Sequence, residues 1–320
     1  YTTLFRSSYE HEIAIIEMGA SHPGDIKTLV ETAEPTCGLI TNVGRAHLQG
    51  FGSFEGVVKT KGELYDYLRT REDGLVFVNA DNDYLCDMLT DEMWCTPYST
   101  DPEKQYTCIS GEVVSCDPLL KFRWRKPIME LEETGASQKW HKVQTNLIGA
   151  YNIDNLLAAI AVGINFGVDR KQICHALESY VPTNNRSQLM ETPYNRLIVD
   201  AYNANPSSMA AALENFIAMT VPSDLSPLTS HPSPLTKMAI LGDMRELGEV
   251  SQEEHQKTVD LLAASTLTDV WLVGEEFGKT TTGFRKFHDV DEVKAEIQKN
   301  RPIGHLILIK GSNGTKLYHS

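Results

Sequence analysis

The sequence predicts an α/β protein with two domains: a first domain on a mainly parallel sheet with an antiparallel edge, and a Rossmann-like second domain. Three observations carry this prediction. Short apolar runs alternate with helical segments over the first 80 residues, apolar and charged residues alternate between Tyr106 and Leu147, and the β–α rhythm restarts after residues 181–187. A β-α-β-α-β rhythm is typical of parallel strands joined by right-handed crossovers, whereas strict alternation is typical of antiparallel ribbons.

The first domain is expected to span residues 8–183. Residues 13–16 are continuously apolar, the pattern of a strand covered on both faces. A helix at 25–34, a strand at 37–42, a helix at 54–68 and a strand at 75–79 follow. The alternation is clearest in Leu120, Phe122 and Trp124 against Lys121, Arg123 and Arg125. Two helices, at 154–166 and 169–180, close the domain.

The second domain is expected to span residues 184–320. Its predicted strands lie near residues 197–200, 238–241, 270–273 and 306–309, with helices between them. Residues 221–236 are rich in Pro and Ser and predict a surface loop. No G-x-G-x-x-G sequence occurs, which argues against a dinucleotide site in this domain.

Composition narrows the class of protein. The 320 residues are 41% hydrophobic and 22% charged, as in ordinary globular proteins. The net charge of -14 argues against nucleic acid or an anionic membrane as the main partner, although a small anionic ligand stays compatible with it. The six cysteines are scattered without a C-x-x-C pair, which favours reduced thiols and a cytoplasmic location. No apolar run approaches the ~18 residues of a membrane span.

The segment FEGVVKTKGELYDYL (residues 54–68) places a lysine where an apolar residue belongs. Its apolar residues recur at the spacing of a buried helical face, and Lys61 falls on that face while Lys59 points away. An inward ammonium needs a partner or a chemical change. The alternative is a lysine whose stem covers the core while its tip reaches water.

Two further polar side chains are expected near Lys61. Glu17 follows the first predicted strand and His47 follows the second. Ligands of doubly wound sheets bind beyond the carboxyl ends of the strands, so these residues are expected to converge at one rim. Carboxylate and imidazole are reasonable ligands for a divalent cation beside phosphate oxygens. Taken singly, Glu17 is equally compatible with a helix cap or surface position, and His47 with an ordinary loop position.

In order along the chain, several motifs resemble the Mur ligases of peptidoglycan synthesis, from about Glu12 to Gly311. They are IIEMGASHPGDI, TNVGRAHLQGFGSFEGVVKTKGELYDYL, NADND, GAYNIDN, DAYNANPSSM and LGDMRELGEVSQEEH. The last of them most resembles the branch that adds D-Ala-D-Ala to UDP-MurNAc-tripeptide. The resemblance implies a monomeric enzyme that uses ATP and Mg2+: ATP phosphorylates a carboxylate, and the dipeptide amine attacks the acyl phosphate.

The resemblance also implies residue roles on the catalytic side. Glu17 and His47 match ligands of a magnesium ion between the γ-phosphate and the substrate carboxylate. Lys61 matches a lysine that the family carbamylates with CO2. Carbamylation would turn the inward cation into an anion.

On the nucleotide side, Asn155 resembles the asparagine that reads adenine, with Asn152 beside it; for Asn152 a helix cap is the favoured alternative. Arg186 and Asp200 match the phosphate-contacting arginine and the ribose-binding aspartate. Further residues are expected to face the closed site or bind the incoming dipeptide, although for each of the last three, taken singly, a structural role is the favoured alternative. They are Asn203, Asn205, Ser207, Asp243, Lys310 and Ser312.

The chain departs from the family pattern in several places. The phosphate-binding loop G-T-x-G-K-[ST] and the sugar-binding domain before it are absent from the sequence, so these 320 residues alone are expected to be inactive. Residues 1–7, YTTLFRS, match one reading frame of a common sequencing adaptor and are expected to be foreign. Ser21, Ala201 and a longer 181–186 segment are smaller departures, and the last shifts the register of Arg186.

Two alternative functions remain open at this stage. One is a sister ligase of the same fold, such as the diaminopimelate- or lysine-adding Mur ligase or folylpolyglutamate synthase. The other is a non-catalytic relative, against which the joint presence of Glu17, His47 and Lys61 argues.

Overall fold

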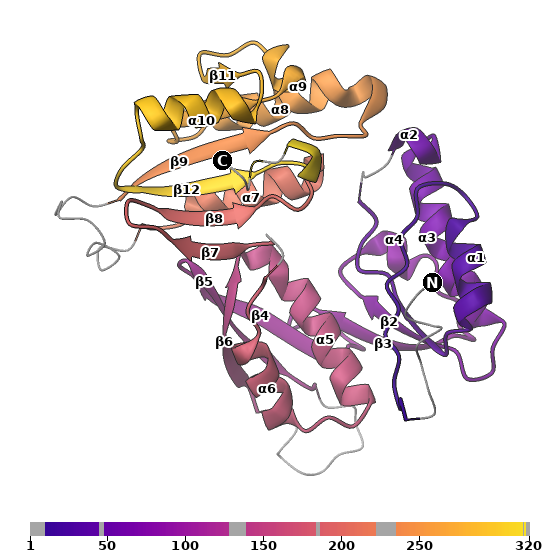
Figure 1. Cartoon of the computed structure of the whole chain (residues 1–320). Helices are drawn as coiled ribbons and strands as arrows, with labels where there is room; N and C mark the ends of the chain where they lie inside the picture. The colour runs from indigo at the N-terminus through magenta and orange to yellow at the C-terminus, as the bar shows by residue number, and fades with distance from the viewer. Residues whose placement is uncertain are drawn as a thin grey trace.

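The computed structural model describes residues 10–44, 48–127, 139–183, 186–221, 235–315 and 317. Within these ranges the chain forms two sheets, each flanked by helices (Figure 1). The first has the strand order β1-β2-β3-β4-β5-β6 and the second the order β11-β10-β9-β12-β8-β7. The predicted α/β class is therefore confirmed.

The first sheet changes from parallel to antiparallel pairing along its width. Strands β1 to β4 pair in parallel, whereas β5 pairs antiparallel with both β4 and β6. The strands are β1 (Cys37–Leu39), β2 (Leu75–Asn79), β3 (Trp94–Ser99), β4 (Ile109–Cys116), β5 (Leu119–Arg125) and β6 (His141–Ile148). The antiparallel edge predicted from the alternating residues is confirmed.

Helices cover both faces of the first sheet. The helices of this part are α1 (Asp25–Ala33), α2 (Leu48–Phe51), α3 (Phe54–Arg69), α4 (Asp83–Cys86), η2 (Ala150–Asn152), α5 (Ile153–Asn165) and α6 (Arg170–Ser179). Alternate residues of β2 face opposite sides, as the pleat requires. Val76 and Val78 pack with Tyr65 and Leu68 of α3, whereas Phe77 packs with the α5 side of the core.

One predicted strand is wrong. Residues 13–16 form no strand, and the side chains of Ile13 and Ile15 are 54% and 85% exposed. An apolar run forms a buried strand only where a neighbouring strand pairs with it and helices cover it. Among the described residues no strand pairs with this segment, and β1 forms that edge of the sheet. Strand β3 and helix α4 were missed, since Pro97 within β3 weakens its strand pattern.

The second sheet is parallel except for its edge strand β7, which pairs antiparallel with β8. Its strands are β7 (Gln188–Glu191), β8 (Arg196–Asp200), β9 (Thr236–Gly242), β10 (Asp269–Val273), β11 (Arg285–Phe287) and β12 (His305–Lys310). Its helices are α7 (Pro206–Ala218), η4 (Gly248–Val250), α8 (Ser251–Ala263), α9 (Glu275–Gly278), α10 (Val290–Lys299) and η5 (Asn313–Thr315). The four strands predicted here are confirmed.

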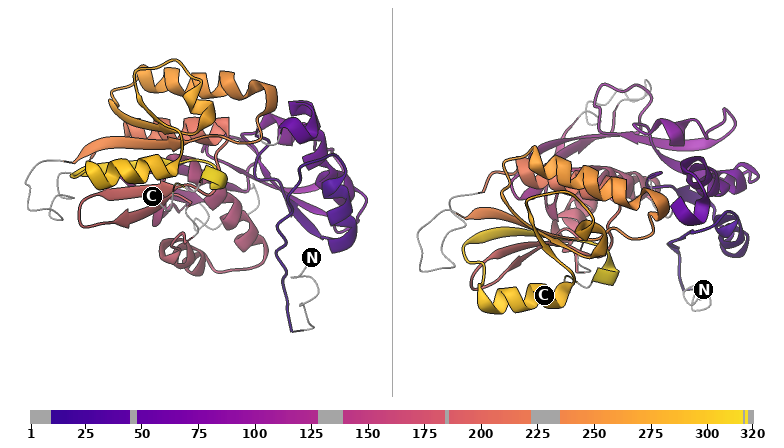
Figure 2. Two further views of the ribbon diagram at one scale, coloured as in Figure 1. Left: turned by 45° about the horizontal axis from the view of Figure 1, so that its top comes forward. Right: turned by 90° about the horizontal axis from the view of Figure 1, so that it is seen from above.

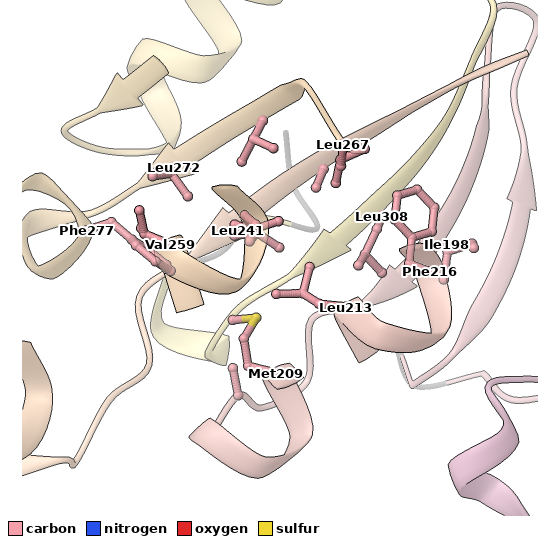
Figure 3. Packing of buried hydrophobic residues seen from close by; sticks show 14 of the residues in the cluster. Ile198, Met209, Leu213, Phe216, Leu241, Val259, Leu267, Leu272, Phe277 and Leu308 are labelled. Carbon is pink, nitrogen blue, oxygen red and sulfur yellow. The ribbon is translucent and has the colours of Figure 1, made fainter. Parts of the chain in front are cut away.

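The core of the second part lies on both faces of this sheet. Phe216 of α7 and Val259 of α8 pack on Leu241 and Leu308 on one face (Figure 3). Val293 of α10 packs on Ile240 and its neighbours on the other face. The arrows of β8, β9 and β12 all point toward the part of the chain that carries α1 to α3 (Figure 1). The carboxyl ends of these strands, where ligands of such sheets bind, therefore face that part.

The two parts meet where the β5–β6 end of the first sheet reaches α7; Figure 2 gives two further views of both parts. Ile148 of β6 belongs to the same buried cluster as α7. The N–H of Thr220 donates to Asp117 Oδ1 at 3.0 Å, and the N–H of Ala150 donates to Asn215 Oδ1 at 3.3 Å. Apolar packing and specific hydrogen bonds thus join the parts. The position of the boundary, at residues 183/184, stays a prediction.

Glu63 of α3 joins the first two long helices. Its Oε1 accepts the N–H of Gly24 at 2.9 Å and its Oε2 accepts that of Lys27 at 2.8 Å, both at the start of α1. Glu63→Ala is expected to lower the free energy of unfolding by about 1–2 kcal/mol, because these N–H groups lose their acceptors. Urea unfolding followed by circular dichroism measures this. Glu63→Gln keeps one acceptor oxygen and should lose about half as much; an unchanged midpoint in both variants would contradict this account.

Candidate functional site

Lys61 lies on the inner side of α3, as its spacing predicts. Its Nζ donates to the backbone carbonyl of Asn42 at 2.7 Å, and the residue is half-buried, whereas Lys59 is exposed. No described carboxylate pairs with it. Burial lowers the pKa of the Lys61 ammonium, because the charged form loses hydration. A lysine of this kind has a larger fraction of the neutral amine, which is the reactive form, than a surface lysine has.

The other two residues expected beside Lys61 are placed less completely. Glu17 is exposed in an irregular segment, so its carboxylate is accessible to a cation, while His47 lies outside the described residues. The chain segments that carry these two residues are in contact. Gly50 of α2, three residues after His47, lies so close to the carbonyl of Ser21, four residues after Glu17, that a Cβ on Gly50 would overlap that carbonyl. Within the described ranges, no group of three or more His, Cys, Asp or Glu side chains could hold a metal ion. The convergence of these three residues stays a prediction.

The two asparagines of GAYNIDN lie at the start of α5. Asn155 is exposed on the first turn, and its Nδ2 is 3.4 Å from Asn152 Oδ1. Asn152 stands at the N-cap position, but its side chain makes no capping hydrogen bond. It donates instead to the carbonyl of Ile148 at 2.8 Å, the last residue of β6. The helix-cap alternative for Asn152 is therefore wrong, and its amide ties α5 to the sheet.

Asp200 ends β8 and is held by two donors. The backbone N–H of Ser187 donates to its Oδ1 at 3.2 Å, and Lys310 Nζ donates to its Oδ2 at 2.6 Å. Ser187 has a left-handed backbone, with φ of 50°, and its hydroxyl is 2.9 Å from the hydroxyl of Tyr151. Arg186 directly precedes Ser187, and its guanidinium carbon is 4.0 Å from the centre of the Tyr202 ring, two residues after Asp200.

Tyr151 was not singled out from the sequence. Burial and the Asp200 carboxylate raise the pKa of the Tyr151 phenol, so it stays a neutral hydrogen-bonding group. It comes from η2 of the first part and meets Ser187 of the second. A tyrosine beside an Asn-x-x-Asn sequence carries no signal of such a contact, which depends on the packing of the two parts.

The loop after β8 is partly occupied by its own structure. Asn205 caps α7: its Oδ1 accepts the N–H of Ser208 at 2.9 Å, and the Ser208 hydroxyl accepts the Asn205 N–H in return. Asn203 Oδ1 accepts the N–H of Ala204 at 2.8 Å. Asn203 and Ser207 are exposed, so they are accessible to a ligand at this rim.

The three residues expected to bind the dipeptide already have internal partners. Asp243 accepts the N–H groups of Glu276 and Phe277, at 3.0 and 2.9 Å, and so caps α9. Lys310 is 1% exposed and pairs with Asp200. The Ser312 hydroxyl accepts the N–H of Arg245 at 3.1 Å and lies 3.4 Å from the carbonyl of Ala204. Their role toward a dipeptide stays a prediction, and the structure gives each a structural one.

The sequence Gly278-Lys279-Thr280 matches the last three residues of a phosphate-binding loop motif, but its structural environment differs from that of such a loop. Lys279 pairs with Glu276, and the Thr280 hydroxyl donates to the carbonyl of Phe277 at 2.7 Å. The N–H groups at the start of α9 are taken by Asp243. No anion-binding cradle is formed by this GKT sequence.

Comparison with known families matches both parts of the chain. Residues 1–163 match the Mur ligase middle domain, and residues 185–313 match the Mur ligase, glutamate ligase domain. The first match includes residues 1–7, whose foreign origin stays a prediction. No described helix is both long and apolar enough to cross a bilayer.

Curated relatives extend this match along nearly the whole chain. The UDP-N-acetylmuramoyl-tripeptide–D-alanyl-D-alanine ligase of Bacillus subtilis is 30% identical over 322 residues, which cover 96% of this chain and 63% of the relative. The enzyme of the same name from Escherichia coli is 30% identical over 328 residues, covering 98% of this chain and 66% of the relative. The chain thus spans a little under two thirds of the length of these relatives.

Solved structures show the same fold. MurF from Acinetobacter baumannii matches with a TM-score of 0.79 at 24% identity, over 99% of this chain and 66% of that one. MurF ligase from Thermotoga maritima, solved in complex with ADP, matches with a TM-score of 0.74 at 21% identity, over 94% and 64%. With family models matched on both parts and relatives aligned throughout, the chain belongs to the Mur ligase family.

Proposed function

We propose that the protein carrying this chain joins D-Ala-D-Ala to UDP-MurNAc-tripeptide at the expense of ATP, as a monomer in the cytoplasm. The observation that carries this proposal is the match along 96% of the chain to a relative named for that reaction. The half-buried Lys61 and the rim that carries Asp200, Asn203 and Ser207 support it.

The chemistry explains why such a site needs both charge and positioning. A carboxylate is a poor acyl donor, because its oxygen leaves badly. Transfer of the γ-phosphoryl group of ATP to that oxygen breaks a P–O bond, releases ADP and makes an acyl phosphate. The dipeptide amine then forms the C–N bond, phosphate leaves with the C–O electron pair, and the amine loses a proton.

Lys61 fits carbamylation on two grounds. Its amine is half-buried, and its one described hydrogen bond is to a neutral carbonyl, that of Asn42. Its lowered pKa favours the neutral amine, which attacks CO2 to form an N–C bond and loses a proton. The product is an anion. Mg2+ would supply charge neutralisation between phosphoryl and carboxylate oxygens, and Glu17 and His47 are the side chains that would hold it.

On the nucleotide side, the chain's own residues bind and orient. We infer that the Asp200 carboxylate accepts hydrogen bonds from the ribose hydroxyls, since Ser187 and Lys310 fix its direction. We expect the exposed Asn155 amide to read the adenine edge, and the exposed Arg186, which stacks on Tyr202, to contact a phosphate. These groups come from both parts of the chain, so the relative position of the parts controls the nucleotide site.

The test is a phosphate-release assay on the full-length protein with UDP-MurNAc-tripeptide and ATP. Phosphate release with D-Ala-D-Ala, and none with diaminopimelate, L-lysine or D-glutamate, is the expected result. Release with a single amino acid instead would identify a sister ligase. No release with any of these amines would identify a non-catalytic relative, and release in the absence of an amine would identify another activity. The 320-residue chain alone is expected to release no phosphate, because it has no G-x-x-G-K-[ST] cradle.

A further inference from the structure

We propose that Arg245, in the loop after β9, binds the terminal carboxylate of the incoming amine substrate. This inference rests on the proposed function and names a residue of its amine subsite. It starts from a contrast at the carboxyl ends of β9 and β12. Asp243, Lys310 and Ser312 all have internal partners there, whereas Arg245 is exposed and no described carboxylate pairs with it.

The loop that carries Arg245 is anchored on both sides of it. The side chains of Met244 and Leu247 are buried in the core cluster beneath α7 and α8. The N–H of Met244 donates to Nε2 of the fully buried His255 at 3.0 Å. Because Nε2 accepts, the ring proton lies on Nδ1, which donates to the carbonyl of Ser251 at 2.7 Å. His255 is therefore a neutral positioning residue for this loop.

The backbone between these anchors turns Arg245 outward. Glu246 has a φ of 63°, a left-handed conformation that residues other than Gly seldom adopt. The N–H of Arg245 donates to the Ser312 hydroxyl at 3.1 Å, which ties the loop to the residues after β12. A strained turn held by buried side chains and three hydrogen bonds is typical of a functional loop rather than of a solvated connection.

The guanidinium group is also held in place. Its Nη2 donates to the carbonyl of Gly314 at 3.2 Å, and it lies flat over that residue, where any Cβ would overlap it. One of its five N–H donors is used there, and a pair on one edge suffices for a carboxylate. Because its position is fixed before a ligand arrives, little side-chain entropy is lost on binding.

The place of Arg245 suits the amine substrate. The ends of β8, β9 and β12 point toward the part of the chain that carries Lys61 (Figure 1). Asp200 and Lys310 are directly paired across β8 and β12, so the nucleotide and amine subsites share this rim. Two residues of extended peptide span about 7 Å at most. A carboxylate bound at Arg245 would therefore place the amine of a dipeptide about one residue farther out than that of a single amino acid, which selects for length.

The experiment compares Arg245→Gln with the wild-type full-length protein in the phosphate-release assay. The KM for D-Ala-D-Ala is expected to rise about 10- to 100-fold, the effect of charge-assisted hydrogen bonds of about 1.5–3 kcal/mol, while the KM for ATP stays unchanged. Arg245→Lys should recover part of the loss. Arg301→Gln is the matched control, since that arginine stacks on Tyr194 before β12 begins, at the other end of the sheet.

A second probe separates carboxylate binding from a structural effect. D-Ala-D-Ala amide lacks the carboxylate, so wild type should use it about 10- to 100-fold less well, and Arg245→Gln should use acid and amide almost equally. If the wild-type protein uses D-Ala-D-Ala and Arg245→Gln still prefers the acid over the amide as strongly as wild type does, the inference is overturned and the proposed function stays intact. If the wild-type protein is active only with a different amine, both are overturned.

Discussion

Replacing Lys61 with alanine is expected to lower the turnover of the full-length protein in the proposed ligase reaction by about 100- to 1000-fold, equivalent to ~3–4 kcal/mol of transition-state stabilisation. The residue is half-buried on the inner side of α3 and donates only to the Asn42 carbonyl among the described contacts. A carbamate there would add a negative charge where the metal-binding residues are expected. Its loss should therefore act on the chemical step and leave the KM for D-Ala-D-Ala nearly unchanged.

The matched control for this prediction is on the same helix. Lys59→Ala removes an exposed lysine two residues away and is expected to keep wild-type turnover. Short carboxylic acids such as acetate should partly restore Lys61→Ala, because they return an anion to the vacated space. Lys61→Arg should stay inactive and resist rescue, since its side chain fills that space without forming a carbamate. Full activity in Lys61→Ala would discard the carbamate role.

The carbamate can also be observed without turnover. Burial lowers the pKa of Lys61, so at a given pH below the usual lysine value its neutral fraction exceeds that of an ordinary, fully hydrated lysine. Carbamylation consumes the neutral amine, and its extent at fixed CO2 should therefore rise with pH and appear at lower pH for Lys61 than for surface lysines. Carbon-13 NMR with labelled bicarbonate measures it. A carbamate signal that persists in Lys61→Ala would assign it elsewhere.

The fold could largely be predicted because its signals are local. Helix α3 was expected from the spacing of its apolar residues, and β5 and β6 from alternation, since both patterns reflect the faces that each element buries. Residues 13–16 show the limit of that reasoning. Their apolar run indicates burial but not what covers it, and Ile13 and Ile15 are exposed among the described residues. Pairing partners and covering helices are tertiary properties that one segment does not contain.

The site was predicted less completely for a related reason. Resemblance to a family indicates which residues matter, but not which of their polar atoms are free. Asp243 and Ser312 were expected to face a ligand, yet their oxygens are used by α9 and by the Arg245 loop. Arg245 itself has no distinctive spacing, and its exposed charge becomes informative only once its neighbours are known. Hydrogen-bond partners far apart in sequence decide such questions.

Asp200 and Lys310 should show a second large effect, on stability. Their side chains are 15% and 2% exposed, and Oδ2 and Nζ are 2.6 Å apart. Lys310→Met is expected to lower the free energy of unfolding by about 3–5 kcal/mol, because it leaves a poorly hydrated carboxylate without its cation. Asp200→Asn should cost less than Lys310→Met, since its single amide oxygen still accepts from one of the two donors, the Ser187 N–H or Lys310 Nζ. Chemical denaturation with the wild-type chain as reference measures both.

The double variant decides whether this pair is a unit. If the two charges serve each other, Asp200→Asn with Lys310→Met should be more stable than the sum of the single losses, by about 1–3 kcal/mol. Additive losses would show that Lys310 acts independently of Asp200.

Nucleotide binding then separates the two roles proposed for Lys310. A lysine that orients the ribose ligand Asp200 should, when replaced, weaken ADP binding without changing the KM for D-Ala-D-Ala, whereas a lysine that contacts the dipeptide should do the reverse. Because its Nζ is already within 2.6 Å of Asp200 and its side chain is enclosed, we expect the first result.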